Sequence, residues 1–100
     1  MNYSFEIRQE ASKEYINAFV WYEEQQENLG YRFKKAFDAK LDQICANPYH
    51  YKVLWKNCHE ALTETFPFSI IYKINEKDKL ITVIAIFHTS RNPKKKFRKI

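Results

Sequence analysis

The sequence predicts an α+β domain in which an αα-hairpin packs on a single antiparallel sheet. Three observations lead to this class: an alternating segment at the N-terminus, two consecutive helical stretches, and several β-prone segments up to the C-terminus. The predicted order is β-α-α-β-β-β, with the N-terminal strand and a C-terminal antiparallel meander in one sheet. The chain has 100 residues, 45% hydrophobic and 17% aromatic. We therefore assign residues 1–100 to a single domain that ends in a basic tail, residues 91–100.

The first two elements are a strand and a helix. In "YSFEIR" (3–8), Tyr3, Phe5 and Ile7 alternate with polar residues, which is typical of a half-buried strand. Ser12 is a candidate N-cap, because a serine side chain can accept a hydrogen bond from a free N–H of the first turn. The helix that follows extends to about Glu27. Its apolar stripe consists of Ala11, Tyr15, Ala18, Phe19 and Tyr22.

A tight connection around Asn28 to Gly30 leads into the second helix, which extends to about Ala46. The apolar residues of this helix repeat at amphipathic spacing. They are Leu29, Phe33, Ala36, Phe37, Leu41 and Ile44. The pair Asn47-Pro48 ends the helix, because the residue before proline disfavours the helical region.

The rest of the chain is strand-like. A short candidate strand lies at 51–55, and longer ones lie at 61–66 ("ALTETF") and 68–74 ("FSIIYKI"). After a turn in "NEKDK", residues 80–88 ("LITVIAIFH") are the most β-prone of the chain. Their nearly continuous apolar run predicts a central strand that is covered, at least in part, on both faces.

The positive charge of the protein is concentrated at one end. Residues 91–100 contain six of the 17 basic residues and none of the 12 acidic ones, so the rest of the chain is close to neutral. A concentrated positive segment attracts polyanions or an acidic protein partner. The alternative is a solvated chain end with no partner.

The sequence also indicates where the protein works. It contains neither a signal-peptide pattern nor the roughly 18 to 20 apolar residues needed to span a bilayer. We therefore expect a cytoplasmic protein that is not bound to a membrane. The spacing of Cys45, His50, Cys58 and His59 fits no common zinc pattern, so we expect no metal and no cofactor, with Cys45 as a small apolar residue near a helix end.

Four segments together resemble the RelE/ParE superfamily of bacterial toxins. They are "WYEEQQENLGYRF" (21–33), "ICANPYHY" (44–51), "FPFSIIYKI" (66–74) and "VIAIFHTSRNP" (83–93), and they occur in the order found in that superfamily. The last segment, with His88, Arg91 and Pro93, looks more like the ParE-like branch.

This resemblance implies the toxin of a type II toxin–antitoxin system, which arrests growth and can contribute to plasmid stabilisation. It implies a cognate antitoxin and a toxin–antitoxin hetero-oligomer. ParE-type members are reported to act on DNA gyrase, whereas RelE-type members cleave mRNA on the ribosome. A third alternative is an inactive remnant that still binds its antitoxin.

Metal-independent RNA cleavage would require a base, an acid and a cation that stabilises the phosphorane. The candidates are His88, Arg91 and Tyr72. Glu60 and Glu64 occupy positions where nuclease relatives often have basic residues, and no tyrosine follows Arg91. We therefore favour a binding protein over an enzyme. The sequence assigns no role to His59, which precedes Glu60.

Each candidate also has a purely structural interpretation. His88 at a strand end can fix a turn, and Tyr72 on an alternating strand can be a core residue. Arg91 can pair with a carboxylate of the first helix, while Trp21 and Tyr22 fit best as helix-packing residues. The residues that we expect to bind the target or the antitoxin are Arg91, Lys94, Lys95, Lys96, Arg98 and Lys99.

Overall fold

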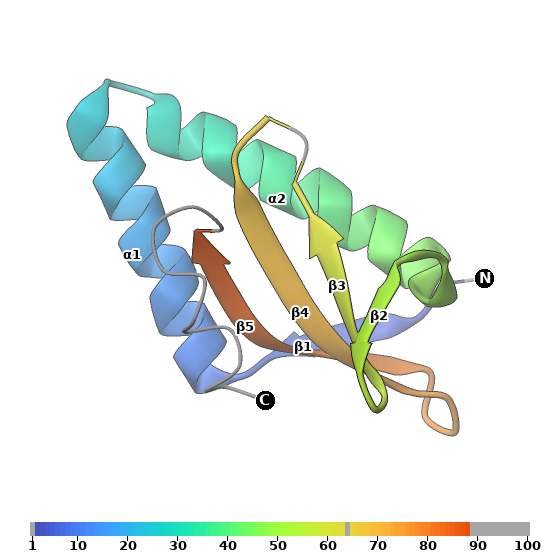
Figure 1. The fold of residues 1–100 in the computed structure, drawn as a ribbon. Helices are drawn as coiled ribbons and strands as arrows, with labels where there is room; N and C mark the ends of the chain where they lie inside the picture. Colours follow the sequence, from blue (N-terminus) through green and yellow to red (C-terminus); the bar gives the residue numbers. More distant parts are fainter. Residues whose placement is uncertain (1, 64, 89–100) are drawn as a thin grey trace.

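The computed structural model describes residues 2–63 and 65–88. The helices and strands within these ranges confirm the α+β class and the helical hairpin (Figure 1). Four strands follow the helices where the predicted order had three, because the short candidate at 51–55 is a strand of the sheet. In chain order the elements are β1 (Ser4–Ile7), α1 (Gln9–Gln25), α2 (Leu29–Ala46), the 3₁₀ helix η1 (Pro48–His50), β2 (Lys52–Trp55), β3 (Cys58–Leu62), β4 (Phe68–Asn75) and β5 (Leu80–His88).

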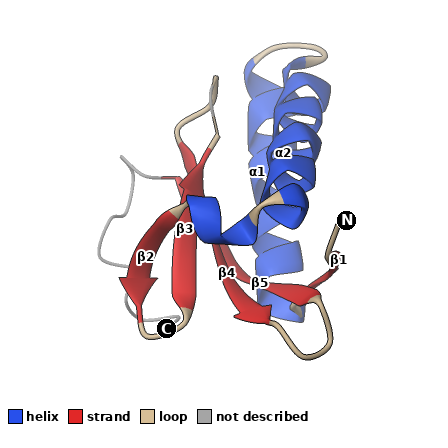
Figure 2. Ribbon diagram, turned by 90° about the vertical axis from the view of Figure 1, so that its right-hand side faces the viewer, coloured by secondary structure: helices blue, strands red, loops and turns tan. Residues whose placement is uncertain are grey.

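The two helices lie on one side of the sheet, as Figure 2 shows. The layer between the helices and the sheet is rich in aromatic rings. Tyr22 of α1 lies 4.8 Å from Phe66, and Phe33 of α2 lies 4.9 Å from Phe68 of β4, measured between ring centroids. Phe33 and Tyr72 are fully buried. Burial of each such side chain contributes about 1.5–3 kcal/mol to the free energy of unfolding, so this layer is a major source of stability.

Helix α1 begins earlier than predicted, and the assignment of Ser12 as its N-cap is wrong. Arg8 occupies the cap position with an extended backbone and makes no side-chain cap hydrogen bond. The N–H of Ser12 donates to the carbonyl oxygen of Arg8 at 2.8 Å, so Ser12 lies inside the first turn. The physical reason is the apolar stripe: Ala11 is fully buried, and it reaches the core only if the helix starts before it.

The connection between the helices is stabilised by a carboxylate. Glu23 accepts hydrogen bonds from the backbone N–H groups of Asn28 and Gly30, at 2.8 and 2.9 Å. These donors lie at the start of α2, where N–H groups have no partner within the helix. Asn28 has a φ of 71°, in the left-handed region that asparagine tolerates better than most residues. Glu23 therefore replaces the side-chain cap that Asn28 does not provide.

The sheet has the order β1-β5-β4-β3-β2. The N-terminal strand joins the sheet beside the meander, as predicted, but the expectation of an antiparallel sheet is wrong for this pair. Strand β1 runs parallel to β5, with Ser4 opposite Leu80 and Ile7 opposite Val83. An alternating sequence pattern is the same in either direction, so it does not reveal the orientation of β1.

The predicted strand at 61–66 is displaced. Strand β3 begins at Cys58 and ends at Leu62, and the chain then turns back toward β4. Thr63 directs this turn, because its N–H donates to the carbonyl oxygen of Phe68 at 3.0 Å and its hydroxyl donates to that of Phe66. The alternating pattern of the sequence therefore continues beyond the end of β3 at Leu62.

Strand β5 is central, and both of its faces contribute to buried clusters, as its apolar run predicts. Ile81, Val83 and Ile86 belong to the core beneath the helices. Ile84, Ala85 and Phe87 belong to a second cluster with Cys58 and Ile71, against which Leu54 packs. Within the described ranges, neither helix is apolar enough over a sufficient length to cross a membrane.

Candidate functional site

The structure describes the candidate residues named from the sequence to different extents. Tyr72 lies in the middle of β4 and is fully described. His88 ends β5 opposite Phe68, and its backbone is described. The six basic candidates, Arg91, Lys94, Lys95, Lys96, Arg98 and Lys99, lie outside the described residues, as does Glu64.

Tyr72 is fully buried, and its hydroxyl is engaged inside the protein. The hydroxyl donates a hydrogen bond of 2.7 Å to the carbonyl oxygen of Pro48, in η1. Burial, with a smaller contribution from Tyr51, raises the pKa of Tyr72 well above its ordinary value. A neutral hydroxyl in this position links η1 to the sheet. This geometry agrees with the interpretation of Tyr72 as a core residue.

His59 lies beside Tyr72 on the neighbouring strand. The two rings are stacked, with centroids 5.6 Å apart, and Tyr49 of η1 meets His59 edge-on at 6.0 Å. His59 is buried, and its Nδ1 has no hydrogen-bond partner among the described residues. The imidazole thus serves as a packing group beneath η1.

A second cluster of polar side chains holds η1 in place at the protein surface. The carboxylate of Glu76, in the β4–β5 turn, accepts hydrogen bonds from the hydroxyls of Tyr49 and Tyr3, at 2.9 and 2.5 Å. It also forms an ion pair with Lys79. Lys79 first, and then the two tyrosine hydroxyls, lower the pKa of Glu76 to about 2. The cluster joins the N-terminus, η1 and the β4–β5 turn.

The sheet face opposite the helices carries a buried acidic residue. Glu60 lies between His59 and Ala61, so its side chain points away from the helices. It is buried and accepts a hydrogen bond from the hydroxyl of Ser69 on β4. Lys52 of β2 is its cross-strand neighbour. A carboxylate here would repel a phosphate that approached this face unless a cation neutralised it.

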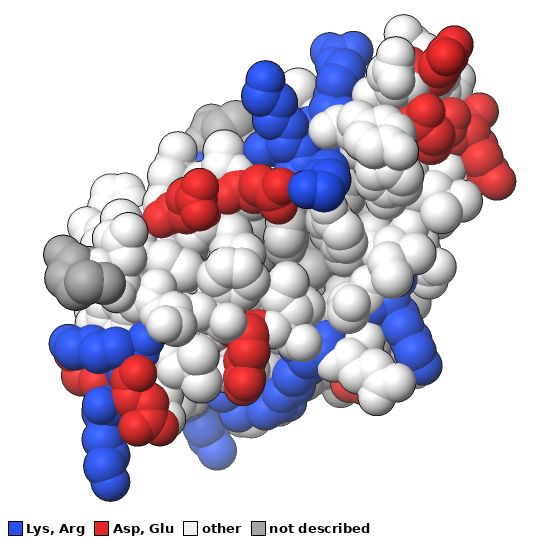
Figure 3. Space-filling model, turned by 180° about the vertical axis from the view of Figure 1, so that it is seen from behind, with Lys and Arg blue, Asp and Glu red and all other residues white. Residues whose placement is uncertain are grey.

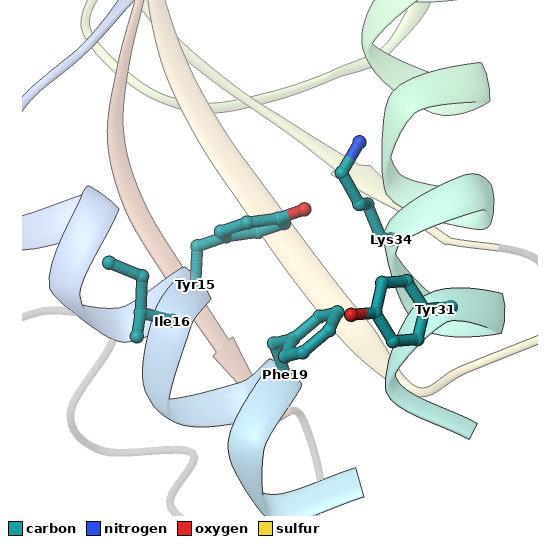
Figure 4. Close-up of a pocket in the computed structure, with 5 residues that line it drawn as sticks. All are labelled: Tyr15, Ile16, Phe19, Tyr31 and Lys34. Carbon is teal, nitrogen blue, oxygen red and sulfur yellow. The ribbon is translucent and has the colours of Figure 1, made fainter. Parts of the chain in front are cut away.

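The outer side of the helical hairpin contains an apolar pocket. It is lined by Tyr15, Ile16 and Phe19 of α1 and by Tyr31 and Lys34 of α2. Figure 4 shows Tyr15 and Phe19 pointing toward Tyr31 and Lys34, whereas Ile16 lies on the other side of α1. The pocket has a volume of about 240 Å³. The Phe19 and Tyr31 rings meet edge-to-face at 4.8 Å, and Lys34 pairs with Asp38 at 2.8 Å.

Large apolar side chains remain exposed around this pocket. The exposed fractions are 54% for Ile16, 46% for Val20 and 59% for Tyr31. Figure 3 shows this side of the molecule, where uncharged surface lies between groups of charged side chains. We call the surface formed by Tyr15, Ile16, Phe19, Val20, Tyr31 and Lys34 the hairpin groove. Apolar patches of this kind on soluble proteins often mark binding surfaces.

A known protein family matches nearly the whole length of this fold. Residues 5–93 match the family described as the ParE toxin of the type II toxin–antitoxin system parDE. The chain belongs to this toxin family. The match extends from β1 to beyond β5, which confirms the RelE/ParE resemblance found in the sequence.

Solved structures with the same fold include RelE proteins. The toxin resembles an E. coli RelE double mutant in the free state with a TM-score of 0.68 and 14% identity, covering 99% of this chain and 94% of that one. It resembles the intact E. coli RelBE toxin–antitoxin complex with a TM-score of 0.63 and 16% identity, covering 89% and 99%. For the RelBE2 complex of Mycobacterium tuberculosis the values are 0.66 and 12%, covering 88% and 92%. No curated protein matches the toxin by sequence.

The described part of the toxin contains no group of three or more histidine, cysteine, aspartate or glutamate side chains that could hold a metal ion. Cys45 and Cys58 are both buried and free. Burial, and then Asp42, raises the pKa of the Cys45 thiol. Cys45 is therefore the apolar helix-end residue that the sequence predicts.

The hairpin groove was not predicted from the sequence. The helical spacing accounts for the buried stripe of each helix, and the remaining apolar residues had no predicted role. Ile16 and Val20 lie four residues apart, off the buried stripe of α1 and on its exposed side. That second apolar pair was the available signal, because residues four apart share one face of a helix.

Proposed function

We propose that this toxin arrests growth in the manner of ParE, by binding a macromolecular target, with DNA gyrase as the favoured candidate. The basic tail is the proposed contact surface for that target, through Arg91, Lys94, Lys95, Lys96, Arg98 and Lys99. The match to the ParE family over residues 5–93 supports this branch. The charge distribution supports the surface, because all of the excess positive charge belongs to the tail.

The observation that most favours binding over RNA cleavage is the engagement of Tyr72. Its hydroxyl is buried and donates to the Pro48 carbonyl oxygen, so it is unavailable to a substrate unless η1 moves. Of the three nuclease candidates, His88 and Arg91 remain.

A cognate antitoxin is the second proposed partner, and the hairpin groove is its proposed docking surface. An amphipathic helix of the antitoxin would place apolar side chains against Ile16, Val20 and Tyr31, which are exposed on the two helices. Lys34 at the edge of the groove pairs with Asp38 at 2.8 Å, and an acidic residue of the antitoxin would join or replace that ion pair. We expect a toxin–antitoxin hetero-oligomer in the cytoplasm.

The decisive experiment separates the two toxin mechanisms. The protein is induced in cells, and DNA supercoiling is measured in parallel with mRNA cleavage in a cell-free translation mixture. We expect impaired supercoiling without cleavage. Ribosome-dependent cleavage would instead assign a RelE-like endoribonuclease, and normal growth at high soluble expression would assign an inactive antitoxin-binding remnant.

Two substitutions make this test specific. In a nuclease that uses His88 as an acid or base, His88→Gln should reduce cleavage about 10²- to 10⁴-fold. In a binding toxin, His88→Gln should have little effect on growth arrest, whereas Arg91→Ala should weaken it. Lys77→Ala, in the exposed β4–β5 turn, is the matched control for loss of one positive charge.

A further inference from the structure

Strand β5 extends well beyond its neighbour β1. Strand β1 pairs only with Leu80–Val83, and the last backbone bond between the two segments runs from the Arg8 N–H to the Val83 carbonyl oxygen at 3.0 Å. From Ile84 onward, the edge of β5 that faces β1 therefore has no strand beside it among the described residues. Backbone N–H groups along such an edge require other partners.

A bulge changes the direction of the backbone at this point. Ile71 of β4 pairs with Ala85, whereas the next residue, Tyr72, pairs with Val83, so Ile84 is an extra residue on β5. Bulges of this kind bend a strand and reorient the residues that follow. They are frequent next to functional sites.

A side chain of α1 occupies the place of the missing strand. The carboxylate of Glu14 accepts a hydrogen bond of 2.9 Å from the backbone N–H of Ile86. The two residues are 72 positions apart in the chain, and the bond is partly buried. A hydrogen bond between a backbone N–H and an ionised carboxylate is stronger than one between neutral groups. Glu14 therefore joins α1 to the part of β5 that extends beyond β1. We call this hydrogen bond between Glu14 and Ile86 the anchor.

The anchor lies two residues before His88, the last described residue of β5, and the basic tail follows in the sequence from residue 91. We propose that Glu14 is a positioning residue of the toxin, which substitutes for a strand partner and fixes the end of β5 from which His88 and the tail begin. This role rests on the proposed function, in which the residues after His88 contact the target. Glu14 acts through β5 and does not itself contact the target.

The first test measures the anchor independently of toxicity. Amide hydrogen exchange, followed by NMR on the full chain, reports the opening of the Ile86 N–H. In Glu14→Ala, this amide should exchange about tenfold faster or more, because a bond to a charged group is lost. Glu14→Gln should restore most of the protection, since its amide oxygen still accepts. Glu10→Ala, on the exposed first turn of the same helix, is the matched control.

The second test asks whether the anchor matters for function. Growth arrest is compared at matched soluble levels among the parent, Glu14→Ala, Glu14→Gln and Ala18→Gly. Ala18→Gly lowers the helix propensity of α1 and removes a buried methyl group but keeps the Glu14 carboxylate, so it measures the effect of lost stability alone. We expect growth arrest to fall about tenfold in Glu14→Ala, to recover in Glu14→Gln and to persist in Ala18→Gly.

The outcomes separate the two levels of the inference. Unchanged exchange of the Ile86 amide in Glu14→Ala would overturn the anchor. Faster exchange with undiminished growth arrest, or an equal loss of growth arrest in Ala18→Gly, would overturn the positioning role. A parent protein that does not slow growth would overturn the proposed function and with it a role of Glu14 in toxicity, while the exchange experiment would still decide the anchor.

Discussion

Glu23 and Gly30 are in direct contact across the helical hairpin: the Glu23 carboxylate accepts the Gly30 N–H at 2.9 Å, and the α1 backbone passes close to the glycine. A Cβ atom on Gly30 would lie 2.7 Å from the carbonyl oxygen of Phe19 and 2.9 Å from the Glu23 carboxylate. Gly30 is thus required by the close approach of the two helices, and its own backbone is helical.

The first prediction follows from this contact. Gly30→Ala should lower the free energy of unfolding by about 1–3 kcal/mol, because overpacking forces the backbone of α1 away. Alanine is otherwise the better helix former by about 1 kcal/mol, so a loss of stability is a specific sign of the clash. Denaturant unfolding measures it, with the exposed Asp42→Ala in the same helix as control. A stabilised Gly30→Ala protein would show that the helices can separate without cost.

The second prediction concerns Tyr72. Removing its hydroxyl in Tyr72→Phe leaves the Pro48 carbonyl oxygen without this donor and should cost about 1–2 kcal/mol of stability. Growth arrest at matched soluble levels should be retained. Tyr31→Phe, at an exposed position, is the control for stability and should change little. A Tyr72→Phe protein that folds normally but no longer arrests growth would return Tyr72 to the list of active groups.

The third prediction is a pH dependence that arises at Glu76. The pKa of this carboxyl is lowered from its ordinary value of 4.5 to about 2. The folded state therefore favours the ionised form, so the stabilisation is fully present above pH 4.5 and disappears as the pH falls toward 2. The temperature of thermal unfolding of the parent should fall as the pH is lowered through this window. That of Glu76→Gln should fall less. The group is exposed, so the difference should shrink with added salt.

The fourth prediction tests the hairpin groove as the antitoxin surface. Ile16→Asp introduces a charge where an apolar contact is proposed and should weaken antitoxin binding about tenfold or more. Because Ile16 is 54% exposed, the free energy of unfolding should change little. Gln25→Asp, exposed at the end of α1, is the matched control. Calorimetric titration with the antitoxin measures both, and equal affinities for the two variants would place the antitoxin elsewhere.

Several features of the fold could be predicted because they depend on residues that are close together in the sequence. Phe33, Phe37 and Ile44 repeat at helical spacing, and α2 ends at Asn47-Pro48 as expected. The residues 80–88 are apolar on both faces, and β5 is indeed buried on both.

Other features depend on contacts between distant segments, and these were missed. The parallel orientation of β1 is set by its pairing with β5, which no local pattern encodes. The start of β3 at Cys58 depends on pairing with Lys73 and on the turn at Thr63. The contact between Glu14 and Ile86 joins residues 72 positions apart, so periodicity gives no sign of it. In the candidate site, the burial of Tyr72 was foreseen as an alternative, whereas its bond to Pro48 was not.

The last prediction concerns the basic tail. Truncation after Pro93 removes Lys94, Lys95, Lys96, Arg98 and Lys99, which are five of the six basic residues of the tail. The truncated domain should remain folded, while growth arrest, or affinity for a polyanionic target, should fall. The affinity that remains should depend less on salt, because each lost phosphate contact reduces the slope of log K against log salt by about 0.9 for duplex DNA.

A matched variant distinguishes charge from length in this test. The full-length chain with the same five residues replaced by glutamine keeps Phe97 and Ile100 but loses the charge. We expect it to behave like the truncated protein in both growth arrest and salt dependence. If the truncated protein fails to fold while the glutamine variant folds and retains toxicity, the tail contributes through Phe97 or Ile100 packing on the domain, and the proposed electrostatic contact with the target is wrong.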